Sequence, residues 1–546
     1  MLAACSNDDN KENNDKVDVT KAVEFKVDFA DYNTEKDVNV TRVNHREIRL
    51  KQKSVDLDNG LIIQSTLQRD TTKQFNSSVT RVLPNDTYTM LAYEATTHSL
   101  KGEMTGTVTD GTFIPTSANK SIRLTPAKYD FVLFNSKVTR NGNNLTIVRD
   151  DADAALIGRT TQTITGTPYD QKVAFTMKHV GAKVKIKLIG FAPIFGVNAQ
   201  FTSLSNHDIP GSSIYDASTG TWSIGTNTGL STSVFGYHST PTPYPLPAKY
   251  TMLSEDVFFM PGTDISKLKL TFQYGQYIYH INLKDTELTF NPRTPLILEN
   301  NGSYTLNIKL FYHFLYLMSD GSKGLISETT FDGGTKTPIA VILSQSNHMA
   351  IALKDANNGV SQDWCTAEYE YKKNVNTHVV SDFPKALTTS ATSGLEETWN
   401  ASYSTNVVKG NKIKGLNPDF MSFYSAAHYN PGITYTGSPA LQWYLPSLSD
   451  WTWVYPLGLG DRTSIAHFSI YYPWKTTLAD VAFIQVDGER LSSKGGLYWS
   501  SSELKQPFLA YTDEAACVQS NADSFFLCVC SKVRGGGVGV RAFVKY

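Results

Sequence analysis

The cysteines have the clearest capacity for chemistry, because thiols can form disulfides, bind metal ions or act as nucleophiles. The chain of 546 residues has five, and four of them, Cys365, Cys517, Cys528 and Cys530, lie in its last third. Cys528 and Cys530 are two residues apart, so on a strand their side chains share a face. A zinc site normally shows two paired-ligand clusters, and this chain shows one. We therefore expect buried thiols or one disulfide rather than a metal site, with the pairing left open.

Other catalytic patterns are missing from the sequence. It contains no Gly-x-Ser-x-Gly, no His-Glu-x-x-His and no Walker A motif. Asp150, Asp151 and Asp153 lack the Gly and the distal Glu of a calcium loop. Cys528 and Cys530 lie in an apolar, strand-like segment, where buried thiols are inert. We assign no catalytic residue, no metal ligand and no cofactor, and expect a protein that is not an enzyme.

Composition favours an all-β protein of the cell surface. Lys and Arg total 50 and Asp and Glu total 51, so no overall field attracts nucleic acid or an anionic membrane. The chain has only 18% charged residues, with 28 Tyr, 27 Phe and 37 Gly. These proportions are typical of β-rich proteins. No apolar run approaches the ~20 residues that a transmembrane helix needs.

The first residues resemble a bacterial lipobox, in which the cysteine becomes lipidated. Leu2-Ala3-Ala4-Cys5 has this pattern, although the charged region and longer apolar segment of a signal peptide are missing before it. Residues 7–16 contain no apolar side chain and predict a flexible tether. An acidic patch after the cysteine resembles the surface-export signal of Bacteroides-group lipoproteins. The resemblance implies lipidation at Cys5 and an outer-membrane lipoprotein precursor.

Alternating apolar and polar residues predict short strands through the first two-thirds. The clearest is 23–29, in which Val, Phe, Val and Phe occupy one face and Glu, Lys and Asp the other. Strands are also expected near 88–93, 129–134, 173–188 and 304–310. The Thr-, Gly- and Pro-rich segment near 160–171 indicates a junction between two domains.

The order of several segments resembles the fimbrillin family, the pilus proteins of Bacteroides-type bacteria. The resemblance covers about residues 20–310 and rests on strand 23–29, the Arg-containing link after it, 83–93, 124–134, Phe175-x-Met177-x-His179-x-x-Ala182-Lys183 and 304–310. It implies a tether at 1–19 and two transthyretin-like β-sandwich pilin domains at 20–165 and 166–310.

Assembly in that family implies a cut and an exchange of strands. A trypsin-like maturation protease would cut after Arg42 or Arg46, with Arg42 preferred because the residues around it have extended character. Strand 23–29 would then leave. A stalk subunit's C-terminal strand would fill the open groove by β-strand addition.

The last third, 311–546, has a different character. Residues 364–373 lack Gly and Pro and predict a helix. A second helix is expected after Pro446, with Ser447 and Asp450 as a capping box and an end at Gly458 and Gly460. The alternating segment 540–546 predicts a terminal strand that closes the domain.

The order of these elements resembles C-type-lectin-like domains of bacterial surface proteins, including the fibrobacter major paralogous type. Leu445-Pro446-Ser447 and Trp499-Ser500-Ser501-Ser502-Glu503 carry it. Ala542 stands where the family often has Cys, and the calcium-sugar triplets of animal lectins are missing, so no calcium or sugar ligand is transferred. Trp453, Tyr498 and Trp499 are candidate ligand-facing aromatics, although core packing is the commoner role.

The fold prediction is therefore mainly β, with two sandwiches followed by an α+β lectin-like recognition domain. The functional prediction is a pilus tip subunit that accepts a strand and binds an unknown surface ligand such as a glycan, without nucleic acid as a partner. One alternative is a non-polymerising surface lipoprotein that captures glycans. Another is a lectin-fold enzyme that depends on Cys528 or Cys530.

Overall fold

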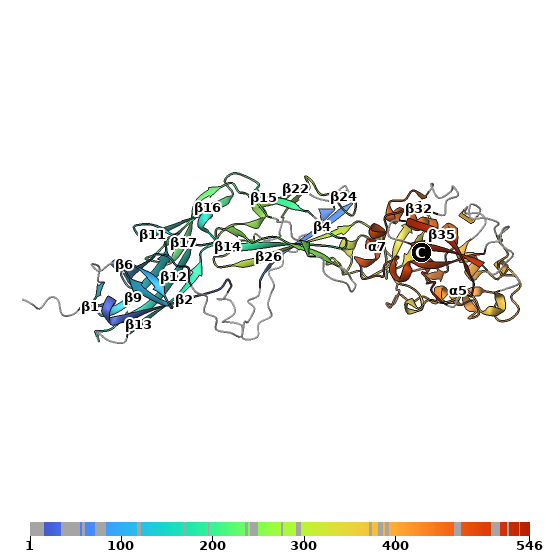
Figure 1. Ribbon diagram of the computed structural model, residues 1–546, viewed down its shortest axis with the longest axis horizontal. Helices are drawn as coiled ribbons and strands as arrows, with labels where there is room; N and C mark the ends of the chain where they lie inside the picture. Colours follow the sequence, from blue (N-terminus) through green and yellow to red (C-terminus); the bar gives the residue numbers. More distant parts are fainter. Residues whose placement is uncertain are drawn as a thin grey trace, which may run out of the picture.

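The computed structural model is elongated, with a β-barrel at one end, paired sheets in the middle and a mixed domain at the other end (Figure 1). The structure describes residues 16–33, 55–56, 60–70, 83–116, 122–166, 171–194, 196–234, 239–240, 249–274, 277–290, 296–370, 374–379, 386–387, 393–462, 471–503, 514–520, 524–533 and 536–546. The prediction of a mainly β protein is confirmed. Among the described residues, none of the helices has the length and apolar character needed to cross a membrane.

The barrel closes through strands that are far apart in sequence. Its hydrogen-bonded order is β12 (Leu156–Ile164), β13 (Gln171–His179), β2 (Val23–Phe29), β7 (Thr112–Pro115), β6 (Leu100–Thr109), β5 (Tyr88–Glu94) and β9 (Ala127–Asn135), which returns to β12. Before β2, β1 (Val17–Asp18) pairs with β8 (Arg123–Leu124), and α1 (Val19–Ala22) leads into the barrel. Strand β2 therefore has the limits that its alternation predicts.

Beyond the barrel, the described strands before residue 313 form further sheets, two of which lie in the middle of the molecule (Figure 1). The longest sheet has the order β19 (Ser239–Thr240), β20 (Tyr250–Leu253), β14 (Ala182–Gly190), β26 (Ser303–Tyr312), β4 (Leu61–Arg69) and β3 (Val55–Asp56), with β21 (Val257–Phe259) also on β14. A second sheet packs on the outer face of the barrel and contains β10 (Thr139–Asn141), β11 (Asn144–Val148), β16 (Ile209–Asp216) and β17 (Thr221–Thr228). The third contains β18 (Ser231–Ser233), β15 (Asn198–Ser203), β22 (Leu268–Tyr274) and β25 (Glu287–Thr289), and β23 (Tyr277–Ile278) pairs with β24 (Ile281–Asn282).

These sheets correct the predicted boundary between residues 165 and 166. Strand β13 follows that boundary but belongs to the barrel, whereas β4 precedes it but pairs with β26 along nine residue pairs. Strand β11 likewise crosses over to pair with β16. Strands from before and after residue 165 therefore share the same sheets, because strands pair through complementary faces and not through proximity in sequence.

Within the described residues, the C-terminal part contains two sheets and several short α-helices. One sheet has the order β28 (Lys323–Gly324), β27 (Tyr316–Met318), β29 (Pro338–Ser344), β30 (Met349–Ala352), β36 (Phe543–Lys545) and β31 (Gln442–Tyr444). The other has β32 (Tyr471–Pro473), β35 (Ser524–Ser531), β34 (Glu514–Ser520) and β33 (Leu497–Glu503). The helices are α4 (Gly394–Trp399), α5 (Met421–Ala427), α6 (Leu448–Trp451) and α7 (Thr476–Ile484). Strand β36 lies inside its sheet, so a terminal strand is present but is shorter than the predicted 540–546.

The two predicted helices of this part have different outcomes. The capping box of Ser447 and Asp450 is confirmed at the start of α6. The helix continues as the 3-10 helix η8 (Thr452–Gly458) and ends at Leu459, which has a φ of 63°. The predicted helix at 364–373 is wrong in its described part, where only the 3-10 helix η5 (Ala367–Tyr369) forms. Trp364 Nε1 donates to Ser500 O (2.8 Å) and Thr366 N donates to Asp419 O (2.8 Å), so this segment bonds to distant chain.

One hydrophobic cluster runs from the middle sheets into the C-terminal part, and hydrogen bonds cross the same junction. Gln485, just after α7, donates from Nε2 to Tyr312 O (2.8 Å) and to Tyr316 Oη (2.7 Å). Tyr316 Oη in turn donates to Ala482 O (2.8 Å). These bonds join the end of β26 to α7 and fix the junction between the two parts.

Candidate functional site

Strand β2 fills a slot in the barrel wall. Val23, Phe25 and Val27 point into the barrel and are nearly inaccessible, while Glu24 and Lys26 lie on the outer side. The ring of Phe25 packs against Phe113, Phe131 and Phe175, with centroids 6.0–6.5 Å apart. The alternation of the sequence thus becomes one apolar face on the core and one solvated face.

Strand β2 forms many more backbone pairs with its neighbour β13 than with its neighbour β7. On one side β2 runs parallel to β13 in seven consecutive residue pairs. On the other side its ladder with β7 has a single pair, Lys26 with Thr112, and Val27 N donates to Gly111 O (2.8 Å). Loss of β2 would therefore expose the backbone of β13 and the apolar pocket that now holds Phe25.

Outward charges contribute little to this attachment. Glu24 lies 2.6 Å from Lys26 Nζ and 3.7 Å from Lys172 Nζ, and the hydrogen bond from Lys26 lowers the pKa of Glu24. All three side chains are exposed, and exposed ion pairs are weak because water and salt screen them. The apolar face and the β13 ladder hold the strand.

Residues after β2 fasten the strand to the middle sheet. Asn33 is buried, and its Nδ2 donates to Asp70 O (2.8 Å) and Ser303 O (3.2 Å), while Ser303 N donates to Asn33 Oδ1 (3.0 Å). Tyr32 stacks on His179 with centroids 4.2 Å apart. Sequence reasoning missed this anchor, because Asn33 has no local signal that distinguishes it from a turn residue.

The predicted processing residues cannot be placed in this geometry. Cys5, Arg42 and Arg46 lie outside the described residues. Lipidation and cleavage at these positions therefore remain predictions.

Three aromatics were predicted to face a ligand, and the structure separates them. Trp453 is half-buried in η8, where the Arg462 guanidinium lies 3.8 Å from its ring centroid. Arg462 Nε also donates to Thr452 Oγ1 (2.9 Å), so a second residue of the same turn holds the cation. Trp453 is partly exposed and remains a candidate.

Tyr498 and Trp499 are buried, which corrects their assignment as ligand-facing residues. They are 2% and 0% exposed. Tyr498 packs against Trp451, and Trp499 Nε1 donates to Gln362 O (2.8 Å). Both residues belong to the interior of the C-terminal part, the commoner role of large aromatics.

The polar residues after Trp499 are also interior. Glu503 is fully buried, forms an ion pair with the equally buried Lys532, and accepts hydrogen bonds from Val375 N (2.9 Å) and Asn376 N (2.6 Å). Ser501 Oγ donates to Glu397, whose pKa is raised to about 8 by burial. The Ser-Ser-Ser-Glu sequence therefore bonds to other buried segments of this part. Its polar composition would instead predict an exposed segment.

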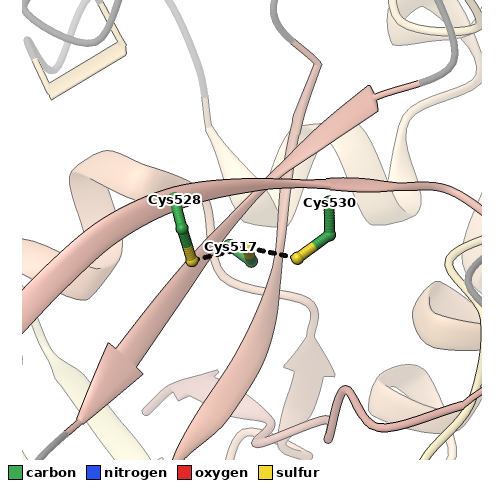
Figure 2. A group of neighbouring side chains, drawn as sticks. All are labelled: Cys517, Cys528 and Cys530. Carbon is green, nitrogen blue, oxygen red and sulfur yellow. Dashed lines mark hydrogen bonds between the residues drawn. The ribbon is translucent and has the colours of Figure 1, made fainter.

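Three thiols meet on one face of the sheet formed by β34 and β35. Cys517 lies opposite Cys528 in the ladder, and its Sγ is 2.7 Å from Cys528 Sγ and 2.8 Å from Cys530 Sγ. Figure 2 shows Cys517 between the other two. Cys517 and Cys530 are buried, and Cys528 is half-buried. Burial raises the pKa of the Cys517 thiol. The Cys528–Cys530 spacing was visible in the sequence, but the strand register that brings Cys517 to them was not.

The comparisons with known proteins give distant structural likenesses. No protein-family model matches the chain, and no curated protein matches it. A fimbrial protein from Bacteroides ovatus is 11% identical, with 96% of this chain and 99% of that chain covered and a TM-score of 0.23. A fimbrial assembly protein from Parabacteroides distasonis is 10% identical, with 44% and 91% covered and a TM-score of 0.27. These TM-scores are low, so the function proposed below rests on the contacts of this chain.

Proposed function

We propose that the protein is a cell-surface pilus subunit that loses its first strand and accepts a strand from a neighbouring subunit. The observation that carries the proposal is the position of β2 in the barrel wall. Phe25 of this strand lies in the barrel core, and the strand pairs with β13 along seven residues. Without β2, the barrel would have an unpaired edge beside an apolar slot. Main-chain bonds to that edge supply affinity, and pockets for alternate side chains set the register of the incoming strand.

The leaving segment would end at Arg42 or Arg46, after cleavage by a trypsin-like protease. Before the cut, a lipid on Cys5 would hold the precursor at the outer membrane. Release must also break the hydrogen bonds of Asn33 to Asp70 and Ser303, so cleavage alone leaves the strand bound until a donor competes for the slot.

A tip position is supported by the two strands that could otherwise act as donors, because both are held inside sheets. Strand β26 lies between β14 and β4 and continues into the C-terminal part. Strand β36 lies between β30 and β31. Neither can leave without disrupting its sheet, so neither strand is available as a donor, and the protein would accept a strand from a stalk subunit. The C-terminal part would then recognise a host or bacterial surface ligand such as a glycan, with Trp453 as a candidate contact.

Limited proteolysis of the purified chain tests the proposal. Trypsin should cut after Arg42 or Arg46, as shown by sequencing the new N-terminus, and a variant with both R42Q and R46Q should no longer give the N-termini that begin at Val43 and Glu47. After the released fragment is removed in mild denaturant, a labelled peptide of residues 17–33 should bind the refolded chain. The same peptide carrying F25D is the matched control and should bind far more weakly.

Two results would refute the proposal. One is the lack of any cut within residues 36–49. The other is a cut chain that binds neither the 17–33 peptide nor a stalk pilin with a free C-terminal strand. A monomer that keeps its first strand and still binds glycans would support the alternative of a glycan-capturing surface lipoprotein.

A further inference from the structure

The three-thiol group of Cys517, Cys528 and Cys530 brings three sulfurs close enough together to bind one ion. All three sulfurs lie within 4.8 Å of one another. A disulfide joins two sulfurs at about 2.05 Å and would leave the third packed against a bonded pair. One ion, in contrast, can bind all three.

We propose that Cys517, Cys528 and Cys530 form a binding site for a soft, thiolate-seeking metal ion such as Zn²⁺. Thiolate ligands select ions of this class over Mg²⁺ or Ca²⁺. The site has a C-x10-C-x-C arrangement, in which the two strands of one hairpin supply all the ligands. The single cysteine pair seen in the sequence thus gains its third ligand from the neighbouring strand.

The backbone already points the ligands correctly. Cys528 and Cys530 are two apart on β35 and share a face, and Cys517 is directly opposite Cys528 on β34. Tetrahedral zinc with Zn–S bonds of about 2.3 Å needs sulfurs about 3.8 Å apart. Binding would therefore spread the sulfurs by roughly 1 Å, which rotation about the Cα–Cβ bonds can provide.

Burial suggests how the site is completed. Cys517 and Cys530 lie in the core, whereas Cys528 is half-buried. The described residues supply three sulfurs, and the side of Cys528 gives solvent access for a water or another small ligand in the fourth position. Binding would exchange thiol protons for the ion and fix the register of β34 against β35.

Cys365 provides an internal control. It is buried, with a pKa raised to about 12 by burial, but lies outside the three-thiol group. The variants C517S, C528S and C530S each remove a proposed ligand, and C365S removes a buried thiol of no proposed function.

Metal titration of the full chain tests the site. The protein is reduced with a phosphine under anaerobic conditions, stripped with a chelator, and titrated with Zn²⁺ against a chromophoric chelator. Native mass spectrometry should give one zinc ion per chain for the wild type and C365S. Each ligand variant should lose at least about tenfold in affinity. Co²⁺ should give a thiolate charge-transfer band in the near ultraviolet that weakens in the ligand variants and not in C365S.

Thiol alkylation of the wild type tests the site without any variant, in case a substitution prevents folding. Zn²⁺ should slow iodoacetamide labelling of Cys517, Cys528 and Cys530, mapped by peptide mass spectrometry, and leave Cys365 unchanged. The proposal is overturned if the reduced chain binds neither Zn²⁺ nor Co²⁺, or if C517S binds zinc as the wild type does. Equal loss of binding in C365S would overturn it too.

Discussion

Asn33 and Ser303 are 270 residues apart in sequence and exchange two hydrogen bonds through one side-chain amide. Ser303 N donates to Asn33 Oδ1 (3.0 Å), and Asn33 Nδ2 donates to Ser303 O (3.2 Å). The side chain therefore pairs with β26 in the way that a neighbouring strand would. The residues that follow β2 are thereby attached to the first residue of β26.

Replacing Asn33 should loosen the first strand. N33A leaves the amide and carbonyl of Ser303 and the carbonyl of Asp70 without this partner, at a cost of about 1–3 kcal/mol in unfolding free energy. After trypsin cleavage, the N-terminal fragment should dissociate faster from N33A than from the wild type in size-exclusion chromatography. N227A, at an exposed position on β17, is the control and should release the fragment at the wild-type rate.

Phe25 should dominate the stability of the barrel. F25A removes a ring that is 3% exposed and packs against three other phenylalanines, so the unfolding free energy should fall by about 3–5 kcal/mol. K26A, the adjacent outward residue, should change it by about 0.5 kcal/mol or less. Urea unfolding followed by circular dichroism measures both. Similar effects from the two variants would contradict the assignment of β2's inner face.

Arg541 and Asp355 form a buried ion pair that should be costly to break. Arg541 Nε lies 2.7 Å from Asp355 Oδ1, with the two side chains 0% and 4% exposed. R541A leaves the Asp355 carboxylate buried without its cation and should cost about 3–5 kcal/mol. The exposed K412A serves as the control for loss of a positive charge, and thermal unfolding is the measurement. If R541A behaved like K412A, the pair would contribute nothing to stability.

Asp480 should make the protein less stable as pH rises. Burial raises the pKa of this carboxyl, against the hydrogen bonds from Ser492 that act in the other direction. The folded chain then keeps a proton that the unfolded chain loses near pH 4, so this contribution is full below pH 4 and is lost as pH rises through the folded pKa. Each pKa unit of difference corresponds to about 1.4 kcal/mol.

The variant D480N should remove that dependence. The wild type should lose stability relative to D480N between about pH 4 and neutrality, measured by urea unfolding at a series of pH values. D487N is the matched control, because Asp487 is exposed and has a φ of 62° that Asn tolerates. A difference between wild type and D480N that stayed constant with pH would refute the raised pKa.

Local patterns in the sequence predict the elements whose structure is decided locally. Alternation gives β2 its exact partition into inner and outer residues, and Ser447 with Asp450 marks the start of α6. Both depend on neighbours within a few positions, so a short window of sequence contains the cause.

Long-range contacts decide the rest, and no short window contains them. Cys517 joins Cys528 through strand register. The segment after Trp364 bonds to Asp419 through Thr366 N and forms only the 3-10 helix η5 within itself. The serines beside Trp499 suggest a surface segment. In the structure the segment is buried, and the backbone of Val375 and Asn376 bonds to Glu503 at its end. Sequence alone could identify these residues, but not what they contact.

Strand β26 also determines how the molecule would respond to mechanical tension. It is paired with β4 along nine residues and with β14 along seven, and its far end is fixed to α7 through Gln485. A pull on the C-terminal part acts along the length of β26, so the bonds of both ladders resist together in shear and do not open one at a time. The same strand that joins the two halves would therefore resist extension of the molecule along this direction.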